Sequence, residues 1–484
     1  MVGPHLLPCE TPEAHKPFDV AAQSTRWVLP ATILGSSMSF IDGSVVNVAL
    51  PVMQRNLATS FGTLQWVVNG YMLTFASLIL FGGSAGDRFG RRRIFMIGLG
   101  IFALASFACG LAPSAPWLVA ARLAQGVGAA LLTPTSLAII GSAYSGKARG
   151  VAVGTWAAAG ALTTALGPPL GGWLVDTIGW RWIFFVNLPI AAAALLFALK
   201  LPADRGINRS EPLDRSGAVL AVLSLGLLTH GLIVLGEGAL IGGAVALTCA
   251  VPAMWLFIRR EARARSPMMP PSLFRDRNFS GANALTVLLY AALGGALFLL
   301  PFLLIQVHGY SAMAAGAAFL PFSVIIGLGS RWSGGLVNKF GARLPLVVGP
   351  TVTAAGFAIL ASSGGNPSYW SGFLPGLTVV SIGMTITIAP LTTTVFDSAP
   401  DEKSGTASGI NNAAARTGSL VAIAALGLAF GAAGSPDVGG SALASAYRLA
   451  MIAAAVLSGL SALTAALTIR PRKAPHATSR NSRI

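Results

Sequence analysis

Long apolar segments, each about 20 residues in length and separated by short loops, constrain this chain more than any other feature. The chain has 484 residues, of which 54% are hydrophobic and only 10% are charged. A soluble protein carries about 25% charged residues. The strands of a membrane β-barrel would be about 10 residues long and would alternate between apolar and polar side chains. The sequence therefore predicts an all-α membrane protein.

The apolar segments predict fourteen transmembrane helices, each long enough to cross about 30 Å of hydrocarbon. No connection between them is long enough to form a soluble domain. The helices are expected at residues 27–50, 64–83, 93–112, 116–140, 149–174, 180–200, 216–236, 238–258, 279–303, 312–334, 343–363, 370–394, 406–431 and 445–468.

The distribution of lysine and arginine predicts the orientation of these helices. Most of the 32 basic residues fall in tails and loops on one side of the membrane. The exceptions are Arg55, Arg181 and Arg448 on the other side, and Arg122 and Arg416 within helices. Because cytoplasmic loops carry an excess of basic residues, both termini are expected in the cytoplasm of a multi-pass protein of the cell membrane. The net charge of +16 belongs to these loops, so no nucleic-acid partner is expected.

The two halves of the chain resemble one another. Gly83–Arg92 aligns with Gly334–Arg343, and Gly150–Gly154 aligns with Gly405–Gly409. Chance similarity of glycine-rich sequence is the alternative, but the loop charges also align. Two related six-helix bundles indicate a transporter that rocks around a central cavity. The expected parts are a tail at 1–26, a bundle at 27–200, linkers with two inserted helices at 201–278, a second bundle at 279–468 and a tail at 469–484.

Gly82–Arg93 lies between the second and third predicted helices and carries charges that cannot lie in hydrocarbon, so it is predicted as a tight loop. Its pattern G-x-x-x-D-R-x-G-R-R resembles a loop signature of the major facilitator superfamily. The resemblance implies a major facilitator fold and a cytoplasmic gate. The gate residues would be Gly83, Asp87, Arg88, Gly90, Arg91 and Arg92. In the second half Asn338 stands in place of Asp87, so that gate is expected to be less tied by charge.

Asp42 is an acid deep within the first predicted helix, and Arg122 is a base at similar depth in the fourth. Two charges at that depth offset each other's cost if they face one another. A modest rearrangement could then switch the protonation of the acid, so Asp42 is a candidate proton carrier with Arg122 as its modulator. The alternative is a static ion pair that fixes helix packing. Gln125, one turn from Arg122, can share its hydrogen bonds, and R-x-x-Q-G-x-G-A-A resembles the family's proton-coupling motif.

The fifth predicted helix contains a proline and many glycines, which bend a helix and allow a neighbour to approach closely. The stretch resembles the G-P-x-x-G-G signature of the exporter branch of the superfamily. A plain packing face is the alternative. The residues concerned are Gly154, Gly160, Gly167, Pro168, Gly171 and Gly172.

The first helix reads Asp42-Gly-Ser-Val-Val-Asn47-Val-Ala-Leu-Pro51 and is similar to a motif of the fourteen-helix drug/proton antiporters. The resemblance implies proton-coupled efflux of small amphiphilic or hydrophobic compounds, such as drugs or antibiotics, by alternating access, driven by the proton gradient without a cofactor. Export of lipids or lipid-like metabolites is an alternative. A channel is a remoter one, and so is an enzyme, because no paired carboxylates or metal-binding clusters lie in the helices. A monomer is expected, with the bilayer and a small-molecule substrate as partners.

A central cavity is expected between the bundles. Arg416 could attract anionic or polar groups of a substrate there, or it could be satisfied by carbonyl groups or by the other bundle. Each aromatic candidate could equally belong to the core or face lipid. The candidate lining residues are Asn47, Trp66, Tyr71, Trp156, Tyr290, Phe298, Asn412 and Arg416.

Overall fold

The structure, a computed structural model, describes residues 25–202, 212–400, 403–432 and 440–470. These residues form helices and connecting turns, and they contain no strand. Thirteen described helical segments are long and apolar enough to cross a membrane, and Trp182–Ala198 is a shorter apolar segment. The predicted all-α fold is therefore confirmed, although one predicted span is shorter than the rest. The two predicted tails lie almost wholly outside the described residues.

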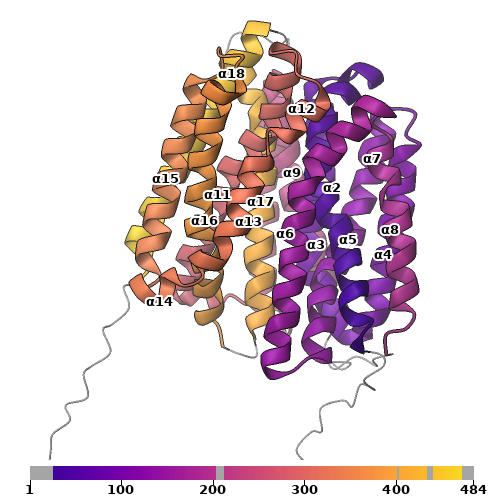
Figure 1. Cartoon of the computed structure of the whole chain (residues 1–484). Coiled ribbons are helices and arrows are strands. Elements are labelled where there is room, and N and C mark those ends of the chain that lie inside the picture. Colours follow the sequence, from indigo (N-terminus) through magenta and orange to yellow (C-terminus); the bar gives the residue numbers. More distant parts are fainter. Residues whose placement is uncertain (1–24, 203–211, 401–402, 433–439, 471–484) are drawn as a thin grey trace, which may run out of the picture.

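The first bundle has α5 at its centre, where it packs along both α3 and α4, while α2 packs on α6 and α8. Its helices appear in indigo and magenta in Figure 1. They are α2 (Val28–Leu57), α3 (Phe61–Phe89), α4 (Arg91–Gly110), α5 (Ala115–Ala143), α6 (Gly146–Thr177), α7 (Trp182–Phe185) and α8 (Asn187–Ala198).

The second bundle stands beside the first and appears in orange and yellow in Figure 1. Within it α11 packs on α17 and α18, and α15 packs on α16 and α18. Its elements are α11 (Arg277–Phe302), η2 (Leu303–Val307), α12 (Ala312–Ala317), α13 (Leu320–Ser333), α14 (Leu336–Phe340), α15 (Arg343–Ser362), η3 (Tyr369–Phe373), α16 (Leu374–Asp397), α17 (Ser404–Ala432) and α18 (Gly440–Thr468).

The inserted helices α9 (Arg215–Gly236) and α10 (Leu240–Arg263) form a hairpin. Helix α9 packs on both α3 and α17, so it covers the junction between the bundles on one side. It begins at Asp214, whose carboxylate accepts a hydrogen bond of 2.9 Å from the backbone N–H of Gly217. Helix α10 contacts α9 and leaves most of its own surface exposed, as a lipid-facing helix does. The short helix η1 (Leu273–Arg275) leads into the second bundle.

The prediction of a tight loop at Gly82–Arg93 is wrong in detail. Helix α3 continues to Phe89 and α4 begins at Arg91, so Gly90 alone separates them. Gly90 has φ +100°, a conformation that a side chain rarely permits. The charged residues therefore lie on two helix ends. Gly341, at the equivalent place in the second half, has φ +72° between α14 and α15, and this agrees with the internal repeat.

The sixth predicted span, 180–200, is broken into α7 and α8. Pro189 lies in the first turn of α8 and has no backbone N–H to donate to the carbonyl group four residues earlier. That carbonyl belongs to Phe185, where α7 ends. The proline therefore explains why a single continuous helix does not form here.

The two ends of the molecule differ in how closely the bundles meet. The end near Arg26, Arg93 and Lys147 is called the basic end, and the end near Leu57 and Thr177 is called the opposite end. In Figure 1 the basic end, with α14, is at the bottom, and the opposite end, with α12, is at the top.

At the opposite end α12 of the second bundle packs directly on α6. The carboxylate of Asp176 accepts hydrogen bonds from the backbone N–H groups of Ala312 (3.1 Å) and Met313 (2.8 Å). Gln306 donates to the side chain of Gln54 at 3.1 Å. A carboxylate of the first bundle thus caps a helix of the second, and the opposite end is closed.

Toward the basic end α6 is largely exposed, apart from the face that packs on α2. Between Gly146 and Leu166 its buried residues are Ala152 and Gly160. Because one side of α6 packs on α2 and another faces lipid, exposure this extensive indicates that its inner side lacks a closely packed neighbour over this stretch. The interface beside α6 is therefore closed at the opposite end and more open toward the basic end, although α3 and α17 still pack on one another there, with Leu80 against Gly409.

Substitution of Gly316 by alanine is expected to force the opposite end apart. A Cβ atom at this position would overlap the carbonyl oxygen of Pro168, so α6 and α12 could not keep their contact. Spin labels can be placed at the exposed positions Leu111 and Trp370, one on each bundle at this end. Double electron–electron resonance should then show a longer distance between the two labels than in the parent protein.

Gly327→Ala is the matched control, because no atom lies within 4 Å of a Cβ added there. Both substitutions raise helix propensity by a similar amount, about 1 kcal/mol. The labelled background would lack Cys9 and Cys249. An unchanged distance distribution in Gly316→Ala would contradict the assignment of this contact as the closing surface.

Candidate functional site

Asp42 of α2 and Arg122 of α5 form a buried ion pair in the first bundle. The Nη1 atom of Arg122 donates to Oδ2 of Asp42 at 2.6 Å. The side chain of Asp42 is 0% exposed and that of Arg122 is 1% exposed, so neither charge is solvated. A lone charge in this environment is expensive, and the pairing offsets much of that cost. The structure thus brings together the two residues that the sequence placed at similar depth.

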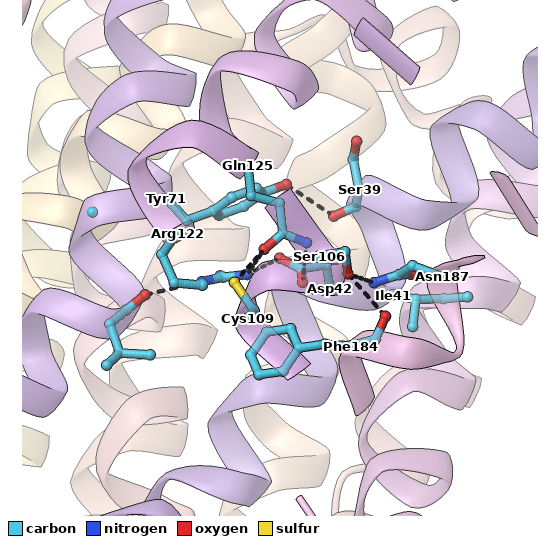
Figure 2. A network of polar contacts seen from close by, with 12 residues as sticks. Ser39, Ile41, Asp42, Tyr71, Ser106, Cys109, Arg122, Gln125, Phe184 and Asn187 are labelled. Carbon is cyan, nitrogen blue, oxygen red and sulfur yellow. Dashed lines mark hydrogen bonds and ion pairs between the residues drawn. The ribbon is translucent and has the colours of Figure 1, made fainter. Parts of the chain in front are cut away.

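Gln125 joins the pair into a closed network (Figure 2). Its Oε1 accepts from Nη1 of Arg122 at 2.7 Å, and its Nε2 donates to Oδ1 of Asp42 at 3.0 Å. The Nε atom of Arg122 donates to the carbonyl oxygen of Val67 on α3 at 3.0 Å. Each oxygen of the carboxylate therefore has its own donor, and three helices hold the network in place.

Aromatic rings enclose the guanidinium of Arg122. The guanidinium carbon lies 4.4 Å from the ring centre of Tyr71 and 5.8 Å from that of Phe184. Such contacts stabilise a desolvated cation. Phe184 belongs to the broken α7–α8 segment, and Ser106 of α4 donates to its carbonyl oxygen at 2.8 Å. Asn187 in turn donates to Ser106 at 3.0 Å.

The sequence predictions did not include Ser106, Cys109 or Asn187. Cys109 lies 3.6 Å from Oε1 of Gln125, and the three residues support the ion pair from α4 and α8. In the sequence, these residues are recognisable only as polar side chains within otherwise apolar helices. Such a side chain needs a hydrogen-bond partner, but the sequence does not identify that partner.

A cavity of about 410 Å³ lies between the two bundles. Four of the predicted residues line it: Asn47, Tyr290, Asn412 and Arg416. Ser44, Phe322 and Ser419 also line it and were not predicted. Its walls combine apolar surface with hydroxyl and amide groups, and this composition suits a small amphiphilic molecule.

The other four predicted lining residues face elsewhere. Trp66 packs near His230 of α9, with ring centres 6.2 Å apart, and Tyr71 lies against Arg122. Trp156 donates to Ser36 at 3.0 Å. Phe298 stacks on Phe302 in the core, although its chain neighbour Leu297 lines the cavity. Successive helical residues point about 100° apart, so one position decides whether a side chain lines the cavity.

Helix α2 separates the ion pair from the cavity. Ser39, Gly43 and Asn47 line the cavity, whereas the Asp42 side chain turns toward α5 in the core of the first bundle. A molecule in the cavity would therefore not touch Asp42 directly. Any effect of one site on the other must therefore pass through the protein between them, and α2 is one such connection.

The predicted gate residues cluster at the basic end of the first bundle. Arg91 donates to Oδ1 of Asp87 from Nε at 3.0 Å and from Nη2 at 2.9 Å, and it reaches the Ala138 carbonyl oxygen at 3.2 Å. Arg92 donates to the carbonyl oxygen of Leu199 at 2.8 Å. These bonds join α3 and α4 to α5 and to the end of α8.

The other gate residues extend this cluster. Gly83 approaches Pro134 of α5, with 3.6 Å between an added Cβ and the proline Cβ. The guanidinium of Arg88 lies 5.5 Å from the ring centre of Phe89, and Gly90 is the break between the helices.

The glycines of α6 permit close contact on two sides. A Cβ on Gly160 would lie 2.7 Å from the ring of Phe40, and side chains at Gly167 and Gly171 would overlap Ser44 and Val45 of α2. On the other side, a Cβ on Gly172 would overlap the Ala312 carbonyl oxygen at the closed end. Gly154 has open space around it, with no atom within 4 Å of an added Cβ, and the same is true of Gly146 and Gly150 at the start of the helix. Pro168 lies inside the helix and lines the cavity.

Two helical bundles that enclose a polar-lined cavity, with one end closed and the other open, define a membrane transporter. The family model for the Major Facilitator Superfamily matches residues 32–423. The chain belongs to the major facilitator superfamily. It is a multi-pass protein of the plasma membrane.

Relatives cover most of the chain. Multidrug resistance protein Stp of Mycobacterium tuberculosis (strain CDC 1551 / Oshkosh) is 39% identical over 82% of this chain and 74% of its own length. Methylenomycin A resistance protein of Bacillus subtilis (strain 168) is 36% identical over 83% and 86%, respectively. Tetracenomycin C resistance and export protein of Streptomyces glaucescens is 34% identical over 86% and 78%.

Among solved structures, an inward-facing bacterial homolog of the human lysosomal transporter Spinster is similar in fold. Its TM-score is 0.63 at 20% identity, and the match covers 94% of this chain and 100% of that one.

The ion pair can be tested by a double-mutant cycle. Arg122→Gln leaves a carboxylate buried without its cation and should lower the free energy of unfolding by about 3–5 kcal/mol. Asp42→Asn/Arg122→Gln together should cost clearly less, because no lone charge remains buried. Denaturant unfolding in detergent measures both effects.

The half-exposed pair of Asp87 and Arg91 gives the matched control. Arg91→Gln should cost less than Arg122→Gln, since the Asp87 carboxylate that it leaves is 43% exposed to solvent. Equal costs for Arg122→Gln and for the double variant at the buried site would show that the pair is not a coupled unit.

Proposed function

We propose that this protein is a proton-driven exporter of small amphiphilic or hydrophobic compounds such as drugs or antibiotics. The observation that carries the proposal is the buried Asp42–Arg122 pair, held on the side of α2 that faces away from the cavity. The printed names of its relatives, which are multidrug and antibiotic resistance proteins, support export as the direction of transport.

The orientation follows from the basic residues. With the basic end in the cytoplasm, as the positive-inside rule predicts, the closed opposite end faces outward. The structure then represents an inward-facing state, in which a compound enters from the cytoplasm or the inner leaflet. Rocking of the bundles would open the contact of α6 with α12 and release the compound outside.

Protonation of Asp42 provides a physical switch. A neutral carboxyl group no longer attracts Arg122 as an anion does, so the hold of α5 on α2 weakens. Arg122 keeps two other acceptors, Oε1 of Gln125 and the carbonyl oxygen of Val67, so it is not left without partners. When Asp42 is protonated, α2 can therefore move away from α5 while the guanidinium of Arg122 keeps these two hydrogen bonds.

Movement of α2 would reach both the cavity and the bundle interface. Ser44 lines the cavity and also lies against Gly167 of α6, while the adjacent Val45 contacts Gly171. Helix α6 continues to the closed end, where Gly172 meets Ala312. The contacts of α2 with α6, and of α6 with Ala312, thus link a change of charge at Asp42 to the closing surface.

Asp42→Asn should abolish export driven by a pH gradient, because the asparagine has a similar shape but cannot carry a proton. Exchange of labelled for unlabelled substrate without a gradient should persist, since it needs only the rocking motion. Both are measured in proteoliposomes with a fluorescent drug substrate and a pH-sensitive dye inside.

Asp276→Asn is the control, since asparagine caps a helix as well as aspartate does and Asp276 caps α11 outside the network. It should transport as the parent protein does. Undiminished pH-driven accumulation and proton counterflow in Asp42→Asn would refute Asp42 as the proton carrier.

A further inference from the structure

Arg416 of α17 carries a positive charge that no described acidic residue neutralises. It lines the central cavity, and none of the ion pairs among the described residues includes it. Its Nε atom is buried without a hydrogen-bond partner in the described part of the chain. Arg122, the fully buried arginine of the first bundle, has a carboxylate, an amide and a backbone carbonyl as partners.

The described acids offer Arg416 no alternative partner within the membrane. Asp42 is committed to Arg122 on the far side of α2. Every other described aspartate or glutamate lies at or near the end of a helix, away from the middle of the bundles. A guanidinium at this depth favours a counter-charge, and the described residues supply none beside it, so an anionic group of a bound ligand could provide it.

The surroundings of Arg416 direct its charge toward the cavity. Its guanidinium carbon lies 3.6 Å from the ring centre of Phe75, which comes from α3 of the first bundle and is itself buried. The ring covers one face of the planar group, so its N–H donors remain for a ligand in the cavity. Asn412 and Tyr290, which also line the cavity, add an amide and a hydroxyl group.

The rest of the cavity favours an apolar body. Leu297, Phe319 and Phe322 line it from the second bundle, and Met72 lines it from the first. A ligand that matches this wall carries its acidic group at one end and a compact hydrophobic part at the other.

We propose that Arg416 is an anion subsite and that amphiphilic organic acids are a substrate class of this exporter. The inference rests on the proposed export function and specifies the charge of its substrates. An acid bound in the cavity would supply the carboxylate that Arg416 lacks and would form a charge-assisted hydrogen bond with it.

The test compares 1-pyrenebutyrate with 1-pyrenebutanol, which share an apolar body and differ in the acidic group. Energised everted vesicles should accumulate both compounds. Arg416→Gln should lower accumulation of pyrenebutyrate about tenfold or more, as expected for loss of a charge-assisted bond, and should change that of pyrenebutanol by less than about twofold. Arg416→Lys should retain part of the pyrenebutyrate transport.

A binding readout on purified protein makes the test independent of transport. Pyrenebutyrate should raise the apparent melting temperature of the parent protein more than pyrenebutanol does, and this difference should vanish in Arg416→Gln. Without ligand, Arg416→Gln should be at least as stable as the parent, because an unpaired cation has been removed.

Several results would overturn the subsite. They are an equal loss of both compounds in Arg416→Gln, no loss of either, and a parent protein that is stabilised no better by the acid than by the alcohol. Failure of the export proposal would give a different result. Asp42→Asn would then leave the accumulation of both compounds unchanged. Arg416→Gln could still abolish the stabilisation of the purified protein by pyrenebutyrate.

Discussion

The burial of one acid against one base is the interaction around which the first bundle is built. Asp42 and Arg122 are shielded almost completely from solvent, and in hydrocarbon neither would be tolerated alone. Their hydrogen bonds to Gln125 and Val67 require α2, α3 and α5 to meet within a few ångströms. The need to satisfy these charges therefore fixes how three helices pack, and it leaves a site whose energy depends on one proton.

The interface between the bundles is asymmetric in its chemistry. At the opposite end the contact is made by glycine, backbone and the Asp176 carboxylate, which caps a helix of the other bundle. These contacts pack the two bundles closely, and few hydrogen bonds would have to break when the bundles separate at this end. Toward the basic end α6 is exposed and the cavity lies within reach. An interface of this kind suits two bundles that open alternately, as the proposed cycle requires.

Two arginines and two aromatic rings join the two sites in space. Tyr71 and Phe75 lie one turn apart on α3, with ring centres 5.6 Å apart. Arg122 lies over the first ring and Arg416 over the second, at 4.4 Å and 3.6 Å. Helix α3 thus contacts the ion pair of the first bundle and the unpaired cation of the second. Within the proposed cycle, a movement of either arginine would therefore change the packing of this pair of rings.

The amino-acid sequence by itself determined the membrane-spanning helices, the internal repeat and the family resemblance. These depend on the length of apolar runs and on motifs that are local in the chain. The similar depths of Asp42 and Arg122 also follow from counting residues along antiparallel helices. The break at Pro189 and the single-residue turn at Gly90 were not predicted, because both depend on local hydrogen bonding that an apolar pattern does not reveal.

Only the tertiary structure decided which face each side chain presents. Phe298 lies in the core beside a cavity-lining neighbour, Asp42 turns away from the cavity, and Arg416 turns toward it without an ion-pair partner in the described part of the chain. In a helix that is apolar on all sides, no periodic pattern distinguishes cavity, core and lipid. The rotation of each helix about its axis is set by contacts with helices distant in the chain, so the orientation of these residues was a property of the packed bundles alone.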